Sequence, residues 1–246
     1  MNLYPHNILT GSKKTMSKTV ILVPCNGGIV FNVDCKLREL EKMGYEVWRT
    51  PGYSAIDQCR SRMAYDAIYR REFEELIWID GDVDFEIEDI KKLQNSEKHI
   101  IAGVYPFKGH PELTFDPLYD DQEIIFGEGG GVYEVHCVAT GFLYTKREVY
   151  THMVDELKLP LCNTSFDCPS YPWFRPNVWE QEDRHYYLGE DFSFCKYAKQ
   201  CGYEIYVDST IKLTHYGQYG YTWEDLAYKK KNISSLRYCK NWSSDK

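Results

Sequence analysis

In the first half of the chain, continuous apolar runs alternate with segments whose apolar residues recur every three or four positions. The run at 19–24 (TVILVP) ends at a proline, as a buried parallel strand does. Residues 33–43 carry apolar side chains at spacings of three and four, which predicts an amphipathic helix that ends at Gly44. Further strands are expected at 46–50, 76–79 and 99–105, and further helices at 55–71 and 86–94. The alternation predicts an α/β fold of Rossmann-like type, with a mostly parallel central sheet flanked by helices.

The pattern changes in the second half, where short extended segments replace the regular alternation. From 114 to 144 these segments surround three glycines at 129–131, which predicts antiparallel additions to the sheet. The loop at 159–179 is aromatic, proline-rich and longer than most connections, so we expect it to be functional. Helices are expected at 146–157 and 190–201, strands at 204–207 and 211–215, and a charged helix from Trp223 onward. Without an internal repeat or linker, the sequence predicts a flexible leader at 1–18 and a single domain at 19–246.

Composition and charge narrow the class of protein. The 246 residues are 43% apolar, which is ordinary for a globular protein, and 29 basic against 37 acidic residues leave a net charge of −8. This charge repels phosphate backbones and anionic lipid, so we expect no nucleic-acid partner. We find neither a window of about 20 apolar residues nor a signal-peptide core, so we expect no membrane span and a cytoplasmic protein. The 9 cysteines contain no CxxC pair and are expected to be reduced thiols.

An acidic cluster directly follows the most apolar strand, at Asp80-Gly81-Asp82, with Asp84 two positions further on. Ligands of open α/β sheets bind beyond the carboxyl ends of the strands, where Asp80 and Asp82 can face one hard cation. The alternative is that these residues only form a turn and cap the strand end.

Two further groups are candidates for chemistry. Glu190 and Asp191 open a predicted helix, where a carboxylate is either an N-terminal cap or a well-held general base for a hydroxyl. His215, at the end of a predicted strand, is either structural or a metal ligand. Arg60 and Arg62 contact a pyrophosphate or nucleotide, or they are solvated helix charges.

Seven aromatic residues of the second half either stack on sugar rings or belong to the core. They are Tyr171, Trp173, Phe174, Trp179, Tyr219, Tyr221 and Trp223.

The order of these elements resembles the GT-A glycosyltransferases, most of all the family-2-like enzymes of bacteriophages and large DNA viruses. The resemblance is carried by TVILVP, CRSRMAYDAIY, LIWIDGDVDF, ATGFLYTKR, YLGEDFSFCKYAKQCGYEIYVD and LTHYG, in that order. It spans about 19–217, and its specificity lies in the ordered set. It implies a nucleotide-binding half at 19–110 and an acceptor-binding half at 111–246, with acceptor recognition in the loop at 159–179.

For the donor, the resemblance implies a set of contacts with a nucleoside diphosphate sugar. The residues are Pro24 and Cys25 beside the base, Arg62, Asp80 and Gly81 on the nucleotide, and Gly141 where the sugar passes close to the backbone. Two departures bear on these assignments. The first strand ends in VPCNGG where PTYN is commoner in the family, and Asp84 adds a third carboxylate.

For catalysis, the resemblance implies Mn²⁺ or Mg²⁺ held by Asp82 and His215, with Asp80 beside them. Asp191, with Glu190 as its acidic neighbour, would be the base that deprotonates the acceptor hydroxyl. The expected activity is metal-dependent transfer of a sugar from a UDP-linked donor to a hydroxyl of a glycan or glycoconjugate, in the host cytoplasm if the protein is viral.

Two rival functions remain open. A sugar-nucleotide nucleotidyltransferase shares the strand–helix start and a metal-binding aspartate, but it usually has a basic residue in a Gly-rich loop after the first strand, and 26–29 (NGGI) has none. A non-catalytic carbohydrate-binding module would use the aromatic residues alone, with the acidic clusters serving as caps.

Overall fold

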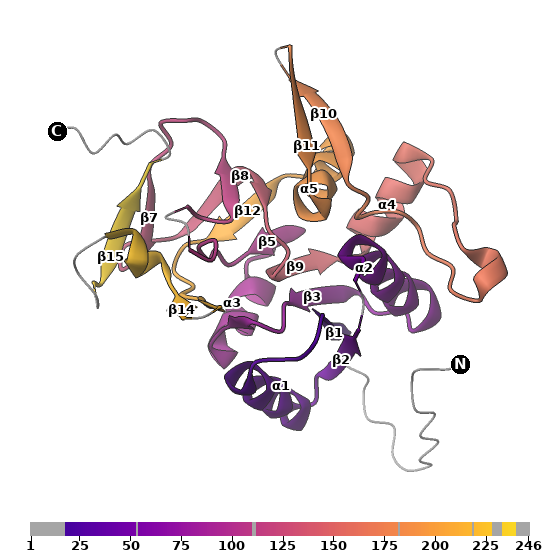
Figure 1. The fold of residues 1–246 in the computed structure, drawn as a ribbon, viewed down its shortest axis with the longest axis horizontal. Helices are drawn as coiled ribbons and strands as arrows, with labels where there is room; N and C mark the ends of the chain where they lie inside the picture. The colour runs from indigo at the N-terminus through magenta and orange to yellow at the C-terminus, as the bar shows by residue number, and fades with distance from the viewer. Residues whose placement is uncertain are drawn as a thin grey trace.

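An eight-stranded sheet with helices on both faces forms the centre of the protein (Figure 1). The structure is a computed structural model that describes residues 18–52, 54–109, 112–181, 183–217, 219–227 and 233–239. The leader expected at 1–18 lies outside the described residues as far as residue 17. None of the helices within the described ranges is long and apolar enough to cross a membrane.

The central sheet confirms the predicted fold class. Its order is β2-β1-β3-β9-β5-β12-β8-β6, and β8 and β9 run against the other six strands. The strands are β1 (Thr19–Cys25), β2 (Glu46–Pro51), β3 (Glu75–Ile79), β5 (Ile100–Ala102), β6 (Phe115–Pro117), β8 (Val132–Val138), β9 (Phe142–Lys146) and β12 (Ile205–Asp208). The regular first half therefore supplies parallel strands, and the second half supplies the antiparallel additions.

The helices and the smaller strands lie around this sheet. The helices are α1 (Phe31–Met43), α2 (Ile56–Tyr65), which continues as the π-helix η1 (Asp66–Arg70), α3 (Ile87–Asn95), α4 (Arg147–Leu157) and α5 (Glu190–Gln200), with 3₁₀ turns η2 (Thr164–Phe166) and η3 (Trp223–Ala227). The smaller strands are β4 (Val83–Asp84), β13 (Thr214–Tyr216) and β14 (Gly220–Tyr221) in one sheet, β7 (Ile124–Gly127) with β15 (Ser235–Tyr238), and the hairpin β10 (Asn177–Gln181) and β11 (Arg184–Leu188).

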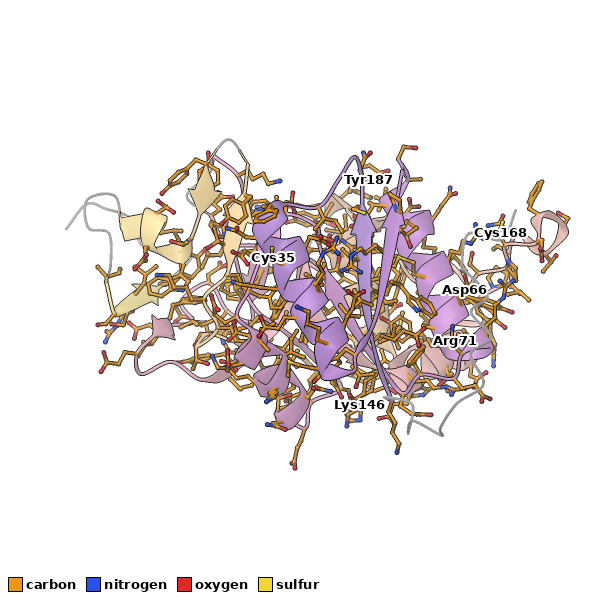
Figure 2. All side chains as sticks on the ribbon, turned by 90° about the horizontal axis from the view of Figure 1, so that it is seen from below. Cys35, Asp66, Arg71, Lys146, Cys168 and Tyr187 are labelled. Carbon is orange, nitrogen blue, oxygen red and sulfur yellow. The ribbon has the colours of Figure 1, made fainter. Side chains whose placement is uncertain are left out.

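The two faces of the sheet bury two separate hydrophobic cores. On β1, Val20 and Leu22 pack in the core that includes residues of α2, α4 and α5, whereas Ile21 and Val23 pack in the core that includes residues of α1 and α3. Because successive strand residues point to opposite faces, a strand covered on both sides is apolar throughout. The sequence of β1 is therefore apolar without interruption because both of its faces are buried. Side chains fill the space between helices and sheet (Figure 2).

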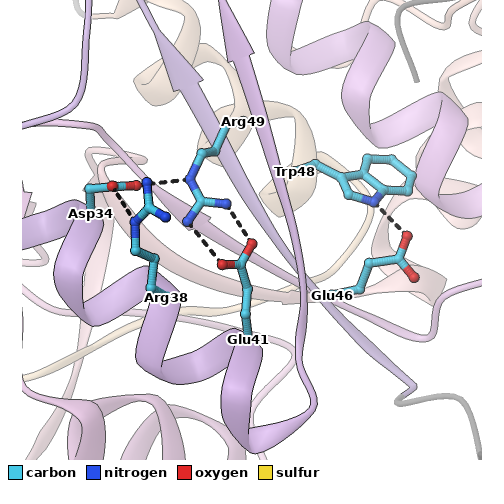
Figure 3. Close-up of polar contacts among 6 residues, drawn as sticks. All are labelled: Asp34, Arg38, Glu41, Glu46, Trp48 and Arg49. Atoms are coloured by element: carbon cyan, nitrogen blue, oxygen red, sulfur yellow. Dashed lines mark hydrogen bonds and ion pairs between the residues drawn. The ribbon is translucent and has the colours of Figure 1, made fainter. Parts of the chain in front are cut away.

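Ion pairs hold the edge strand β2 to helix α1 (Figure 3). Arg49 of β2 donates from Nε to Asp34 at 3.1 Å and from Nη1 to Glu41 at 2.6 Å, two carboxylates about two turns apart on one face of α1. The helix ends at Gly44, whose φ of 103° is the left-handed conformation that a glycine adopts without strain. The chain can therefore turn directly into β2.

The long loop of the second half contains structure that its sequence does not predict. The segment expected to be a loop at 159–179 ends in β10, which pairs with β11 in a hairpin that projects beside α5 (Figure 1). Trp173 and Phe174 are fully buried, so these two aromatics are core residues and cannot stack on a sugar. Trp223 is also core, at 2% exposure.

The prediction of a charged helix from Trp223 onward is wrong for the described residues. A short 3₁₀ turn, Trp223–Ala227, is followed after residues outside the description by strand β15, which pairs antiparallel with β7. Tyr238 of β15 packs its ring against Phe115 at 5.6 Å between centroids. Burial against a distant strand thus overrides the helical charge pattern.

Candidate functional site

The carboxyl end of β3 carries the acidic cluster and lies against two backbone segments. Asp80 donates its N–H to the carbonyl of Gly141 at 2.9 Å, and Gly81 accepts a hydrogen bond from Val30 at 2.7 Å. A Cβ on Gly141 would come within 2.2 Å of the Tyr105 hydroxyl and 2.9 Å of an Asp80 carboxylate oxygen. Only glycine leaves room for these two groups, which explains why the backbone at Gly141 can approach the site so closely.

Asp82 faces a histidine and a lysine. Lys108 donates from Nζ to Asp82 Oδ2 at 2.5 Å, and His215 Nε2 lies 3.8 Å from Asp82 Oδ1. His215 is positioned from β13 by a contact of 2.9 Å between Nδ1 and the carbonyl of Pro106. A carbonyl only accepts, so Nδ1 carries the proton and Nε2 presents a lone pair toward Asp82. Burial lowers the pKa of His215, partly offset by this hydrogen bond and by Asp82, which favours the neutral imidazole.

A buried arginine joins the two acidic groups that are distant in sequence. Arg60 of α2 is 3% exposed, donates from Nη2 to Asp80 at 2.7 Å, and places Nε 3.5 Å from Glu190 at the start of α5. Burial acts to lower the pKa of Arg60, but the charges of Asp80 and Glu190 and the hydrogen bond to Asp80 together outweigh it, so the pKa is raised. Its Nε and Nη1 make no hydrogen bond within the described part of the chain. Arg60 thus connects the end of β3 with the first turn of α5.

Asp191 has the environment of a general base. Burial, followed by the neighbouring charge of Glu190, raises its pKa from 3.8 to about 6. Phe192 donates its N–H to Asp191 Oδ1 at 2.7 Å, and this bond and Arg60 oppose the rise. A carboxylate with a pKa near 6 is ionised at neutral pH and still basic enough to accept a proton from a hydroxyl.

Tyr105 lies among these groups and was not anticipated as a site residue. Its hydroxyl accepts the N–H of Gly141 at 3.0 Å, and its ring meets that of His215 edge-on, with 4.8 Å between centroids. Burial raises the pKa of Tyr105 well above its usual value, and the charges of Asp80 and Asp191 raise it further. The Tyr105 hydroxyl is therefore within electrostatic range of both Asp80, which follows β3, and Asp191, at the start of α5.

The remaining predicted residues lie at different distances from this centre. Pro24 and Cys25 end β1, and the Cys25 Cβ is 3.4 Å from the position that a Cβ on Gly81 would take. Arg60 is the arginine that contacts Asp80; Arg62, two positions along the helix, acts on Asp66, whose pKa burial raises and the charges of Arg70 and Arg62 lower. The contacts of Pro24, Cys25 and Arg62 with a nucleotide stay predictions.

The third carboxylate of the β3 cluster is engaged elsewhere. Asp84 forms an ion pair with Lys36 of α1 at 2.9 Å and caps Phe85 at 3.0 Å. For Asp84, the alternative that the carboxylate has a local structural role therefore applies.

The donor set around Asp82 suits one divalent cation that is completed by a substrate. Two ligands of one Mg²⁺ at about 2.0–2.1 Å lie at most about 4.2 Å apart, so Asp82 Oδ1 and His215 Nε2 are close enough to share an ion. No group of three His, Cys, Asp or Glu side chains converges in a way that could hold a metal within the described ranges. Mg²⁺ usually combines one or two protein ligands with phosphates and water. Asp80, which is paired with Arg60, adjoins this pair, and its ligation stays a prediction.

Comparisons with solved structures show the fold. The chain is similar to the crystal structure of A197 from STIV, with a TM-score of 0.52 and 17% sequence identity, over 81% of this chain and 85% of that chain. The fold is GT-A-like. The inositol-1-phosphate CTP transferase from T. maritima matches with a TM-score of 0.36 and 14% identity, over 81% of this chain and 70% of that chain. A glycosyltransferase involved in the glycosylation of the major capsid of PBCV-1 matches with a TM-score of 0.26 and 15% identity, over 55% of this chain and 65% of that chain. No family model and no curated protein matches the sequence.

Three residues of this site are not predicted, or are predicted only in part, from the sequence. Tyr105 stands at the end of a predicted strand, where a polar-tipped aromatic is a usable signal, and Lys108 follows three positions later in a loop with no pattern of its own. Arg60 is a candidate together with Arg62, and the resemblance selects Arg62; helical spacing alone does not say which of the two faces the carboxylates.

Proposed function

We propose that this protein transfers a sugar from a nucleoside diphosphate sugar to a hydroxyl of a glycan acceptor, with a bound Mn²⁺ or Mg²⁺. The observation that carries the proposal is the convergence of β3, α5 and β13 on one centre: Arg60 lies between Asp80 and Glu190, and Asp82 faces His215. The resemblance of the ordered motifs to GT-A glycosyltransferases supports the same reaction.

On the donor side, Asp82 and His215 would hold the cation, and Lys108 is the adjacent basic group. A bound divalent cation neutralises the charge that develops on the departing diphosphate. Lys108, which contacts Asp82, is a flexible side chain with 39% exposure and can turn to a phosphate oxygen when a cation takes its place on the carboxylate. Gly141 leaves the backbone close to the donor sugar.

On the acceptor side, Asp191 would receive the proton of the attacking hydroxyl. The acceptor oxygen forms a bond to the anomeric carbon while the bond from that carbon to the diphosphate oxygen breaks, and the nucleoside diphosphate leaves with the electron pair. Glu190, held at 3.5 Å from Arg60, adds the negative charge that helps to raise the pKa of Asp191. Arg60 thus acts as a positioning residue.

The metal assignment is tested by UDP binding with Mn²⁺ and with EDTA. The wild-type protein is expected to bind UDP more tightly with Mn²⁺ than with EDTA. Asp82→Asn should lower the affinity for UDP in the presence of Mn²⁺ at least about tenfold, because losing a direct metal ligand costs no less than losing a residue that supports one. Asp84→Asn is the matched control, since Asp84 pairs with Lys36. Isothermal titration calorimetry measures all three proteins. Equal gains in wild type and Asp82→Asn would contradict the assignment.

The reaction itself is tested with a panel of nucleotide sugars and Mn²⁺. Release of free nucleoside diphosphate, slow without an acceptor, is the expected result. Formation of nucleoside triphosphate from nucleotide sugar and pyrophosphate would instead identify a nucleotidyltransferase, and binding of sugars without either reaction would identify a carbohydrate-binding module.

A further inference from the structure

A cavity of about 630 Å³ lies beside α5, whose Phe192 and Lys196 line it. Its walls come from the sheet edge at β6 and β8, from α5, and from one face of the β10–β11 hairpin. Small-molecule sites commonly measure about 300–1,000 Å³, so the size is that of a ligand site. The donor side of the proposed function does not use this cavity.

The hairpin presents an aromatic wall to the cavity. Trp179 and Tyr186 are directly opposed in the antiparallel register, and both line the cavity. The neighbouring opposed pair, Val178 and Tyr187, points to the other face of the hairpin, where Tyr187 is 82% exposed (Figure 2 labels it). The apolar–aromatic alternation of β10 and β11 is therefore divided between a cavity face and an open face.

The charges that line the cavity are balanced. Arg184 and Lys196 supply two positive charges, and Asp116 and Asp120 supply two negative ones. Burial, together with the charge of Lys196, lowers the pKa of His136, so its imidazole is neutral at neutral pH. A cavity without net charge does not select a phosphate or another anion. An aromatic wall beside carboxylates and amines suits a neutral polyol, which offers a C–H face to the ring and hydroxyls to the charged groups.

We propose that this cavity binds a neutral pyranose ring, the acceptor sugar of the transfer, an assignment that rests on the proposed function. The first turn of α5 connects the cavity with the base: Phe192 lines the cavity, and Asp191 precedes it directly. A sugar seated against Trp179 would thus share its cavity with the residue that directly follows the proposed base. Acceptor recognition is carried by the hairpin that ends the expected recognition loop and by the sheet edge.

The test measures sugar binding without a nucleotide. A panel of methyl pyranosides, of gluco, galacto, manno and N-acetylglucosamine configuration, is titrated into the full chain and followed by saturation-transfer NMR. At least one glycoside is expected to bind wild type, and Trp179→Ala should weaken that binding at least about tenfold, the loss expected for a central aromatic contact. Tyr187→Ala is the matched control, because it removes an aromatic ring from the open face of the same hairpin.

The outcomes separate this proposal from the proposed function. UDP and Mn²⁺ binding measured on the same three proteins should be unchanged by Trp179→Ala, which also shows that the variant is folded. If no glycoside binds, or if Trp179→Ala and Tyr187→Ala weaken it equally, the acceptor assignment is overturned while nucleotide binding stands. If a glycoside binds through Trp179 but no nucleotide binds with Mn²⁺, the sugar site is supported and the proposed transfer function is refuted. The bound sugar would then not be the acceptor of a transfer.

Discussion

At the scale of a single residue, the raised pKa of Asp191 has a cost in stability. Its carboxyl is mostly buried beside Glu190, so its pKa in the folded protein, about 6, exceeds the ordinary value of 3.8. A group that binds its proton more tightly when folded lowers the free energy of unfolding as pH rises from the unfolded to the folded pKa. Above pH 6 the ionised carboxylate therefore destabilises the fold by at most about 3 kcal/mol, from about 2 pKa units at 1.36 kcal/mol each.

We predict that Asp191→Asn raises the free energy of unfolding at pH 7.5 by about 1–3 kcal/mol, and by much less at pH 4, because wild type is protonated there. Urea unfolding at the two pH values measures the difference. The exposed Asp121→Asn is the control and should change little at either pH. The stabilised Asp191→Asn should lose sugar transfer. A variant that is no more stable at pH 7.5 than at pH 4, relative to wild type, would contradict the pKa assignment.

At the scale of elements, Arg60 connects three of them. It is rooted in α2 and pairs with carboxylates that follow β3 and begin α5, while its guanidinium lies 5.7 Å from the centre of the Trp78 ring. Removing one partner from a buried ion pair leaves the other charge unpaired, which costs more than the pair itself contributes. Because Asp80 and Glu190 retain 27% and 19% exposure, water relieves part of that cost.

We predict that Arg60→Met lowers the free energy of unfolding by about 3 kcal/mol at pH 7, because Asp80 and Glu190 lose the buried charge that pairs with them. Unfolding in urea checks this. Arg237→Met is the control: Arg237 pairs with Glu123 and both side chains are more than half exposed, so its loss should cost less than about 1 kcal/mol. Equal losses in the two variants would refute the bridging role.

At the scale of the whole molecule, strand β15, near the end of the described residues, packs against the edge of the central sheet. The rings of Phe115, Phe126 and Tyr238 pack together, with 5.6 Å between Phe115 and Tyr238 and 6.5 Å between Phe126 and Tyr238. These residues come from β6, β7 and β15, so the antiparallel additions close on the last strand. The same β6 edge forms part of the cavity wall.

We predict that Tyr238→Ala lowers the melting temperature by about 4–8 °C, which corresponds to a loss of about 2 kcal/mol for a half-buried ring in a chain of this length. Tyr238→Phe keeps the ring and should retain most of the stability. Differential scanning calorimetry compares the two with wild type. A melting temperature unchanged in Tyr238→Ala would mean that β15 does not support the core.

The sequence predicts some segments of the fold and misses others. The 19–24 run and the helix at 33–43 were predicted within a few residues, because their periodicity reflects burial that local sequence already records. The hairpin at β10–β11 and the strand β15 were not, because an edge strand takes its stability from a partner elsewhere in the chain. The candidates Asp82 and His215, 133 positions apart, were named from strand ends and are 3.8 Å apart in the structure.

The sequence by itself determined which elements form the parallel half of the sheet and which acidic groups lie at its rim, since the carboxyl ends of parallel strands meet at one edge. Only the tertiary structure decided that Arg60 pairs with Asp80, that Tyr105 and Lys108 lie beside the acidic residues, and that a cavity lies between the hairpin and the sheet edge. These depend on how helices rotate and loops pack against distant residues, and the free energies involved arise from contacts that no local pattern records.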